Sequence, residues 1–483
     1  MVEAKAMRMM FSLTEKHQPH LKIVKKCITA IPHETVLQEL LSQLKTINFR
    51  EASEIEGEEK LQKKHYIVYS MVEILKTAQT NGWQLCRNNG QTFIYNGAFW
   101  KAIDRELLQS FFGEAAELLG IPKADARFYQ FRLDLLKQFD AVAYLPAPER
   151  KDGLTLINFL NGTFVVDAAN QSLRNSLAED FITYQLPFDY NPSATAPMFT
   201  TFLNRVLPDI EKQDVLQEYL GYVFVSSNKL KLEKVLLLYG TGANGKSVFI
   251  EIMSAMLGKD NVSRYSLESI TDPKSYSRAE LSTKLLNLST EISGKMDKGL
   301  FKQLASGESV EARHIYGAPF TMDNYAKLLF STNELPKETE STDGFFRRWL
   351  IIAFEETIPE NEQDKELAGK IIANELSGVL NWVLVGLNRL LIQKKFSKSE
   401  SVKEQVKNFR QQSDSVLIFL EEAGYQPDLN QTKALKELFV WYRSFCEENG
   451  YRSCSSSTFS GRLKNAGYEV KRLSLGNVVY CKK

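Results

Sequence analysis

The chain has 483 residues, of which 43% are hydrophobic and 25% are charged, and this composition excludes a mostly disordered protein. Its 60 Lys and Arg residues almost balance its 59 Asp and Glu residues, so a uniformly basic coat for nucleic acid is also excluded. At roughly 150 residues per domain, the length favours about three domains.

The five cysteines are widely spaced and form no CxxC pair. This pattern argues against a disulfide framework and a zinc ribbon, and it favours a reducing, cytoplasmic compartment. No run of about 18 apolar residues is present, so we expect no membrane-spanning segment. We also expect no signal peptide, because no clear small-residue cleavage site follows the short apolar patch at the start.

Residues 1–190 are expected to form a mostly helical α+β region. Apolar residues recur at helical spacing in three segments, 35–44, 67–75 and 105–143. Two other segments, 83–100 and 154–167, favour hairpins because Asn and Gly lie between short β-rich runs. The segment 187–197, rich in Pro, Ser and Asn, is the clearest linker.

Residues 191–395 are expected to hold a parallel sheet between helical segments. Four near-continuous apolar runs are typical of strands that are buried on both faces, and they occupy residues 234–239, 284–290, 326–332 and 348–354. Residues 396–483 follow as a charged linker or long helix and a C-terminal domain with two helix-like segments. That domain ends in a predicted hairpin with Gly476–Asn477 at its turn.

A phosphate-binding loop is the strongest signal in the chain. Residues 240–247, GTGANGKS, match the pattern GxxxxGK[ST] in full, between a strand-like and a helix-like run. Lys246 is expected to reach the β- and γ-phosphates, and the Ser247 hydroxyl to ligate Mg²⁺. The predicted nucleotide-binding residues are Gly240, Thr241, Gly242, Ala243, Asn244, Gly245, Lys246, Ser247 and Val248.

Two polar residues follow neighbouring predicted strands. Glu291 follows the run 284–290, where a carboxylate can orient the attacking water and contribute to the metal site. Asn333 follows the run 326–332 and can hydrogen-bond the γ-phosphate or the water. The alternatives are a surface glutamate and an ordinary turn asparagine.

An arginine pair, Arg347 and Arg348, precedes the last predicted strand. One hypothesis is that an arginine finger is supplied to the nucleotide of a neighbouring subunit, where its charge stabilises the transition state. The alternative is a pair of structural salt bridges.

A basic hairpin is predicted between Glu291 and Asn333. Residues 310–316 and 319–322 are strand-like, and the turn carries Arg313, His314 and Tyr316. Lys298 and Lys302 lie on the helix before it. Basic and aromatic side chains together suit a single-stranded DNA backbone and its bases, whereas the alternative is an ordinary exposed hairpin.

The order of these motifs resembles superfamily 3 helicases, in particular the phage and plasmid primase–helicase group that includes the poxvirus primase–helicase. The resemblance runs from about residue 154 to the C-terminus and rests on the phosphate loop, Glu291, the basic hairpin, LLFSTNELP and GFFRRW. It implies an α/β fold: an AAA+-type P-loop ATPase core with a leading helical collar, an N-terminal α+β region and a C-terminal winged-helix domain. It also implies a homo-oligomeric ring, usually a hexamer, that uses ATP and Mg²⁺ to move along single-stranded DNA.

The resemblance assigns roles by position. Lys246 and Ser247 would bind phosphate and Mg²⁺, Glu291 would be catalytic, and Asn333 would sense the γ-phosphate. Arg347 or Arg348 would be the finger, and the spacing does not choose between them. In the tail, STFSGRLKNAGY would be a recognition helix and YEVKRLSLGNVVYCKK a wing. Residues 433–483 hold ten Lys or Arg and four Asp or Glu, a local charge of +6 that suits phosphate contacts.

The sequence departs from the family in two places. Many members have two adjacent acidic residues in the second motif, but Thr290 precedes Glu291 here. Relatives often begin with a primase domain whose aspartates bind metal, whereas this chain has no Asp before Asp104. We therefore expect the primase domain to be missing or encoded on another chain, as a separate replisome partner.

The leading hypothesis is an ATP-dependent helicase that acts on single-stranded and forked DNA during replication of a phage, plasmid or mobile element. An alternative is an ATP-dependent initiator or loader that binds an origin without processive unwinding. A third is a P-loop kinase of small metabolites, against which the basic hairpin and the extra helical domains count.

Overall fold

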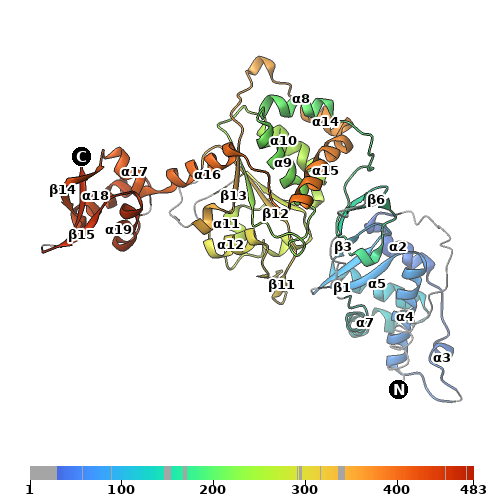
Figure 1. Cartoon of the computed structure of the whole chain (residues 1–483). Helices are drawn as coiled ribbons and strands as arrows, with labels where there is room; N and C mark the ends of the chain where they lie inside the picture. The colour runs from blue at the N-terminus through green and yellow to red at the C-terminus, as the bar shows by residue number, and fades with distance from the viewer. Residues whose placement is uncertain are drawn as a thin grey trace.

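The computed structural model describes residues 30–483, except positions 57, 89, 146–153, 167–170, 291, 293–295, 316, 336–342, 452 and 475. It is a mixed α/β protein in three parts, with the C-terminal part joined to the central part through helix α16 (Figure 1).

In the N-terminal part, helices cover one face of a small antiparallel sheet of order β1-β2-β3. The predicted helical run 105–143 is three helices, because the chain turns at Gly120, which has a φ of +103°, and is again extended at Phe128. The elements are α2 (His33–Gln43), α3 (Phe49–Ala52), α4 (Lys63–Thr80), β1 (Gln84–Asn88), β2 (Gln91–Tyr95), β3 (Trp100–Ile103), α5 (Arg105–Leu118), α6 (Lys123–Arg127) and α7 (Tyr129–Val142).

A second antiparallel sheet connects this part to the centre. It consists of β4 (Thr155–Phe159), β5 (Gly162–Val166) and β6 (Gln171–Arg174), followed by the short helix η1 (Ala178–Asp180). The predicted hairpin at 154–167 is confirmed, and β6 extends it. The core that β4 and β5 help to build extends along the chain to Val402.

The central sheet is parallel, with strand order β13-β7-β12-β9-β8. Its strands are β7 (Val235–Tyr239), β8 (Val262–Ser263), β9 (Leu286–Ser289), β12 (Lys327–Thr332) and β13 (Trp349–Ala353). The four predicted strands are confirmed, whereas the two-residue edge strand β8 is too short to leave a pattern in the sequence. β7, which leads into the phosphate-loop sequence, lies between β13 and β12.

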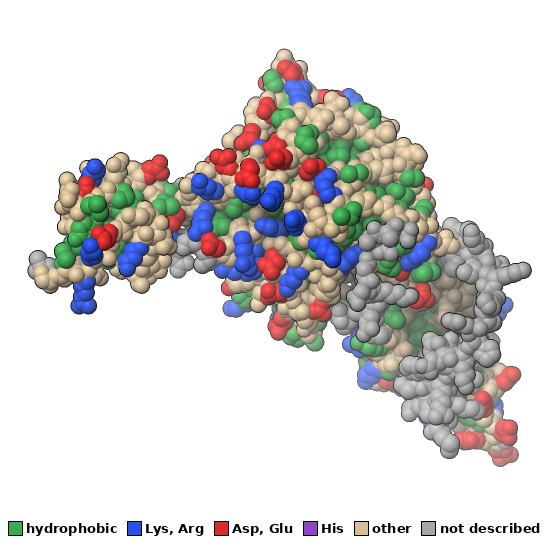
Figure 2. All heavy atoms as spheres, in the orientation of Figure 1, with side chains coloured by type: hydrophobic (Ala, Val, Ile, Leu, Met, Phe, Trp, Pro, Cys, Tyr) green, Lys and Arg blue, Asp and Glu red, His purple; other side chains and the backbone are tan. Residues whose placement is uncertain are grey.

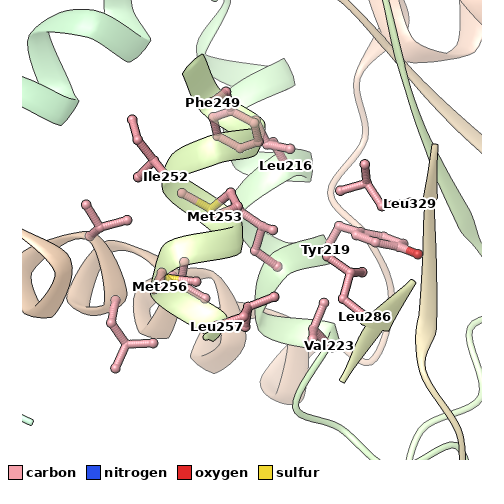
Figure 3. Close-up of a cluster of buried hydrophobic side chains, with 14 of the residues drawn as sticks. Leu216, Tyr219, Val223, Phe249, Ile252, Met253, Met256, Leu257, Leu286 and Leu329 are labelled. Carbon is pink, nitrogen blue, oxygen red and sulfur yellow. The ribbon is translucent and has the colours of Figure 1, made fainter. Parts of the chain in front are cut away.

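Helices α9 and α10 cover one face of this sheet. Figure 3 shows Phe249 and Met253 of α10 and Tyr219 of α9 within one apolar cluster beside Leu329 of β12. The Tyr219 hydroxyl donates to the Leu328 carbonyl at 2.6 Å, which ties α9 to the sheet. The helices of this layer are α8 (Pro197–Val206), α9 (Ile210–Tyr222), α10 (Lys246–Leu257), α14 (Leu367–Asn374) and α15 (Leu376–Gln393).

Helix α15 is, among the described residues, the one helix that is long and apolar enough to span a membrane. It packs closely on α9: a side chain at Gly386 would meet Gln217, and one at Gly221 would meet Leu387. Six apolar residues along one side of α15 belong to the central core, so this face has the packing of a core helix: Val379, Leu380, Val383, Leu384, Leu387 and Leu390. The predicted linker 187–197 docks on it, since Asn381 donates to the carbonyls of Asn191 and Ala194.

The opposite side of the sheet carries shorter elements and the predicted hairpin. They are α11 (Leu267–Thr271), η3 (Ala279–Thr283), α12 (Lys298–Ser306), β10 (Val310–Ala312), β11 (Phe320–Met322) and α13 (Asp343–Phe346). The short helices η2 (Lys259–Asn261) and η4 (Glu360–Glu362) instead lie beside α10 and α8. The hairpin's strands are shorter than predicted, because their pairing runs only from Val310 with Met322 to Ala312 with Phe320.

The C-terminal part holds three helices and an antiparallel sheet of order β14-β16-β15. Its elements, with the helix that leads to it, are α16 (Glu400–Ser413), α17 (Ser415–Glu422), β14 (Gln426–Ala434), α18 (Leu435–Glu448), α19 (Ser456–Asn465), β15 (Val470–Leu473) and β16 (Gly476–Lys482). The final hairpin is confirmed, but its predicted turn position is wrong: Leu473 pairs with Gly476, so the chain reverses before Gly476.

Candidate functional site: a cavity at the carboxyl edge of the sheet

A cavity of 850 Å³ lies where the strands of the central sheet end. Its lining includes the predicted phosphate loop from Gly242 to Val248 and the ends of β9 and β12. Its other walls are helix α8 and the segment 358–367. Ligands of open α/β sheets bind in such crevices at the carboxyl ends of strands.

The backbone of the predicted phosphate loop has the bends that its glycines permit. Gly242 and Gly245 have φ values of +117° and +81°, and Ala243 between them is also left-handed at +49°. The Asn244 side chain donates to the Phe354 carbonyl at 3.0 Å, and the Ile358 amide donates to the Ala243 carbonyl at 2.8 Å. The end of β13 and the segment that follows it therefore hold the loop in place.

Lys246 is the first residue of α10 and is 5% exposed. Its amine donates to the Gly240 carbonyl at 2.5 Å and to the Asn244 side-chain oxygen at 3.0 Å. Both acceptors are uncharged, and burial lowers the pKa of Lys246. A phosphate oxygen at this position would be the first charged partner of the amine, which is the situation in which a buried cation binds an anion strongly.

The ends of the neighbouring strands also reach the cavity. Thr332 is the last residue of β12 and Asn333 follows it, whereas Thr290 follows β9, and all three line the cavity. The structure thus brings Asn333 and the phosphate loop to one cavity. Glu291 lies outside the described residues, so its predicted role stays a prediction.

A magnesium ion would find few protein ligands here. Ser247 is exposed in the cavity beside Lys246. The described residues hold no group of three or more His, Cys, Asp or Glu side chains that could bind a metal. This donor set fits Mg²⁺, which keeps several waters and is held mainly by substrate phosphates with one or two protein oxygens.

The apolar wall of the cavity was not predicted from the sequence. It is formed by Met198 and Phe202 of α8, facing Ile358 and Leu367. A residue far away in the sequence holds the N-terminus of α8: the buried Glu375 carboxylate accepts hydrogen bonds from the amides of Met198 and Phe199 at 3.0 and 2.9 Å. Pro197 indicates the start of a helix in the sequence, but no pattern indicates that this helix contacts the segment 358–367.

The predicted arginine pair lies at the opposite edge of the sheet. The Val235 amide donates to the Arg348 carbonyl at 2.8 Å, which places the pair beside the first residue of β7. The Arg347 side chain is 64% exposed, whereas that of Arg348 is 9% exposed. Arg348 donates to the Ser306 hydroxyl and the Gly344 carbonyl, so its contacts are those of a structural residue.

The predicted DNA-binding hairpin carries an exposed Arg313. Its guanidinium lies 5.2 Å from the centre of the Tyr276 ring and donates to the Tyr276 hydroxyl at 2.9 Å. Tyr276 is 40% exposed and was missed in the sequence. His314 instead turns inward, stacking on Phe320 and pairing with Glu280 at 3.4 Å. Tyr316 lies outside the described residues.

The remaining predicted DNA contacts differ in exposure. Lys298 and Lys302 are half-buried on α12, and each already contacts another residue of the chain. On the predicted recognition helix, Arg462 is 6% exposed and pairs with Asp414 at 3.2 Å. Figure 2 shows Lys and Arg side chains gathered on the visible face of the central part, around the level of β12 and β13.

Two families match parts of the chain. Residues 64–208 match "D5 N terminal like", and residues 238–348 match a family described as being of unknown function, DUF5906. The first runs from α4 through α8, and the second runs from the end of β7 through the phosphate loop to Arg348.

Two of the curated relatives are viral proteins. The chain is 26% identical over 239 residues to "Putative helicase L207/L206" of Acanthamoeba polyphaga mimivirus, which covers 46% of this chain and 24% of that protein. It is 24% identical over 331 residues to "Putative helicase 121R" of Invertebrate iridescent virus 3, covering 60% of this chain and 34% of that protein. The chain thus matches about a quarter to a third of the length of these relatives.

Among solved structures, the C-terminal region of NrS-1 superposes with a TM-score of 0.46 at 12% identity, over 87% of this chain and 99% of that one. A second structure of the same region, residues 305–718, has a TM-score of 0.46 at 14% identity, over 86% and 98%. Together, the family match and the viral relatives relate the chain to primase–helicase-like proteins.

Proposed function

We propose that the protein is an ATP hydrolase of the superfamily 3 type that unwinds DNA, and that its nucleotide binds in the 850 Å³ cavity. The observation that carries this proposal is the buried Lys246 amine, which contacts two uncharged oxygens beside the N-terminus of α10. Amides of a helix start, a buried cation and a glycine-bent loop together form a triphosphate site. The D5-like match and the relatives named putative helicases support DNA unwinding as the task.

In this proposal the cavity has a phosphate end and a base end. Lys246 and the loop amides bind the β- and γ-phosphates, and Asn333 hydrogen-bonds the γ-phosphate or the attacking water. Bound Mg²⁺ would neutralise phosphate charge, with the Ser247 hydroxyl as its protein ligand. The flat ring of Phe202 and the apolar side chains of Met198 and Ile358 suit the faces of a purine.

Arg347 is the better candidate for the finger. Arg348 is buried and contacts residues of its own chain, whereas Arg347 is exposed. β7 has five residues, which at about 3.3 Å each separate the arginine pair from the phosphate loop by roughly 16 Å. In this proposal Arg347 therefore serves the nucleotide of another subunit, in a homo-oligomeric, hexameric ring.

For DNA, we propose that Arg313 and Tyr276 contact the single strand, with Lys298 and Lys302 behind them. An exposed ring beside a guanidinium offers a base a stacking surface and its phosphate a cation. The C-terminal part, in the proposed winged-helix role, would add phosphate contacts to the forked duplex. Residue-level roles for Glu291, His314 and Tyr316 remain proposals from the motif order.

Strand displacement on a forked duplex at saturating ATP tests the proposal. We expect the wild-type chain and Lys259→Ala, a change at the other end of the same helix region, to displace the strand, and Lys246→Ala to fail. Binding to the fork without displacement by the wild-type chain would instead favour an initiator or loader. Displacement that survives in Lys246→Ala would contradict the proposed mechanism.

A further inference from the structure

Glu233 makes contacts that its place in the sequence does not explain. Its carboxylate lies 3.4 Å from the guanidinium of Arg347 and 3.3 Å from that of Arg348, just before β7 begins. Its backbone is left-handed, with a φ of +54°, in a residue type that rarely adopts this conformation. Strained backbone of this kind is retained where the surrounding structure requires it, often at functional sites.

The neighbouring residue ties Arg347 down as well. The Lys234 amine donates to the Arg347 carbonyl, and burial, followed by the nearby Arg347 charge, lowers the pKa of Lys234. Two successive residues before β7 thus hold both the backbone and the side chain of Arg347. The other arginine provides a fixed support, since Arg348 is buried against Ser306 and shares the same carboxylate.

The geometry points to Glu233 as the positioning residue of the finger; this inference rests on the proposed function. The contact with Glu233 uses Nη2 of Arg347, and a guanidinium has five N–H donors, so others stay available for a phosphate oxygen. Glu233 fixes the direction of an exposed, otherwise flexible side chain before the neighbouring subunit arrives. This lowers the conformational entropy that is lost when the finger engages.

The arrangement also links two nucleotide sites through one strand. Glu233 and Lys234, which lead into β7, contact Arg347 at the amino end of the strand, and the phosphate loop follows its carboxyl end. A shift of β7 that accompanies events at the subunit's own nucleotide would therefore move the finger that serves the neighbouring nucleotide. Only five strand residues separate the two ends.

The first test compares Glu233→Gln and Glu233→Gly in the full chain. Both remove the carboxylate charge, but glycine also accepts a positive φ, so Glu233→Gly relieves the backbone strain. We expect both variants to lose about tenfold in kcat with KM unchanged, as when a supporting partner of a catalytic group is removed. Glu233→Asp should recover part of the rate. An unchanged or higher kcat in both variants would overturn the inference.

The second test asks at which site the defect occurs. Glu233→Gly subunits are mixed with Lys246→Ala subunits, which retain Glu233 and Arg347 but have an impaired phosphate loop. If Glu233 serves the neighbouring site, ATP hydrolysis in the mixture should exceed the sum of the two components, as it should for Arg347→Ala mixed in the same way. Rescue of Arg347→Ala without rescue of Glu233→Gly would overturn the role of Glu233 alone. Rescue of neither would overturn the shared site itself.

Discussion

The guanidinium of Arg348 donates to the hydroxyl of Ser306 twice, from Nε at 3.1 Å and from Nη2 at 2.8 Å. These hydrogen bonds join the start of β13 to the end of α12. They also distinguish Arg348 from the adjacent Arg347, which the sequence alone cannot do. One is part of the packed interior, and the other is available to a partner.

The two arginines should therefore give opposite results on substitution. Arg348→Ala leaves Glu233 and Ser306 without their buried partner and should lower the free energy of unfolding by about 3 kcal/mol. Arg347→Ala should change stability by less than about 0.5 kcal/mol and lower kcat on the order of 10³-fold. Urea unfolding and steady-state ATP hydrolysis of both variants check this. Equal losses of stability would contradict the assignment.

The buried Lys327 should make stability depend on pH. It starts β12, its amine donates to Ser227 at 2.7 Å, and burial lowers its pKa to about 7. From that pKa up to the unfolded value of about 10.5, the unfolded chain binds more protons than the folded one, so stability should rise with pH. The slope is at most about 1.4 kcal/mol per pH unit.

Unfolding of the wild-type chain and Lys327→Met between pH 7.5 and 9.5 measures this effect. The variant carries no titrating amine at that position, so its stability should rise less steeply across the window. Parallel curves would show that Lys327 titrates normally in the folded protein.

A substitution at the base end of the cavity should weaken nucleotide binding and have little effect on folding. Phe202→Leu keeps most of the volume but removes the flat ring, and it should weaken ATP binding by about tenfold. Thr200→Ala, on the exposed side of α8, is the matched control and should bind normally. Fluorescent-nucleotide titration reports both constants, and equal affinities would place the base elsewhere.

In the C-terminal part, substitutions of a structural arginine and of a DNA-contacting arginine should have different effects. Arg462 is paired with Asp414, which also caps α17 at the Val416 amide, so Arg462→Ala should destabilise this part by about 3 kcal/mol. Arg472 is exposed on β15, and Arg472→Ala should weaken DNA binding and lower the salt slope by about one. Binding isotherms across a salt series distinguish the two. An unchanged slope for Arg472→Ala would contradict a phosphate contact there.

The sheet was predictable because strands buried on both faces leave continuous apolar runs, as in β7 and β12. The phosphate loop was predictable because its bends need glycine at fixed positions. β8 was not, since two residues carry no periodicity. Turn positions were also uncertain: Gly476 was expected in the final turn but opens β16.

The apolar wall of the cavity could not be predicted, because Phe202 and Ile358 are brought together by tertiary packing of segments far apart in the chain. Residues that look alike in the sequence can also differ in how deeply the fold buries them. The sequence treats Arg347 and Arg348 alike, and it cannot indicate that His314 turns inward while Arg313 stays exposed.

The central claim is that Lys246 binds the triphosphate of a nucleotide whose hydrolysis responds to DNA. The most direct measurement is steady-state ATP hydrolysis with and without single-stranded DNA, for the wild-type chain, Lys246→Ala and the control Lys259→Ala. We predict hydrolysis that DNA stimulates in the wild-type chain and the control, and a loss of at least about a hundredfold in Lys246→Ala while its unfolding midpoint is unchanged. Equal, DNA-independent hydrolysis by all three proteins would contradict the account.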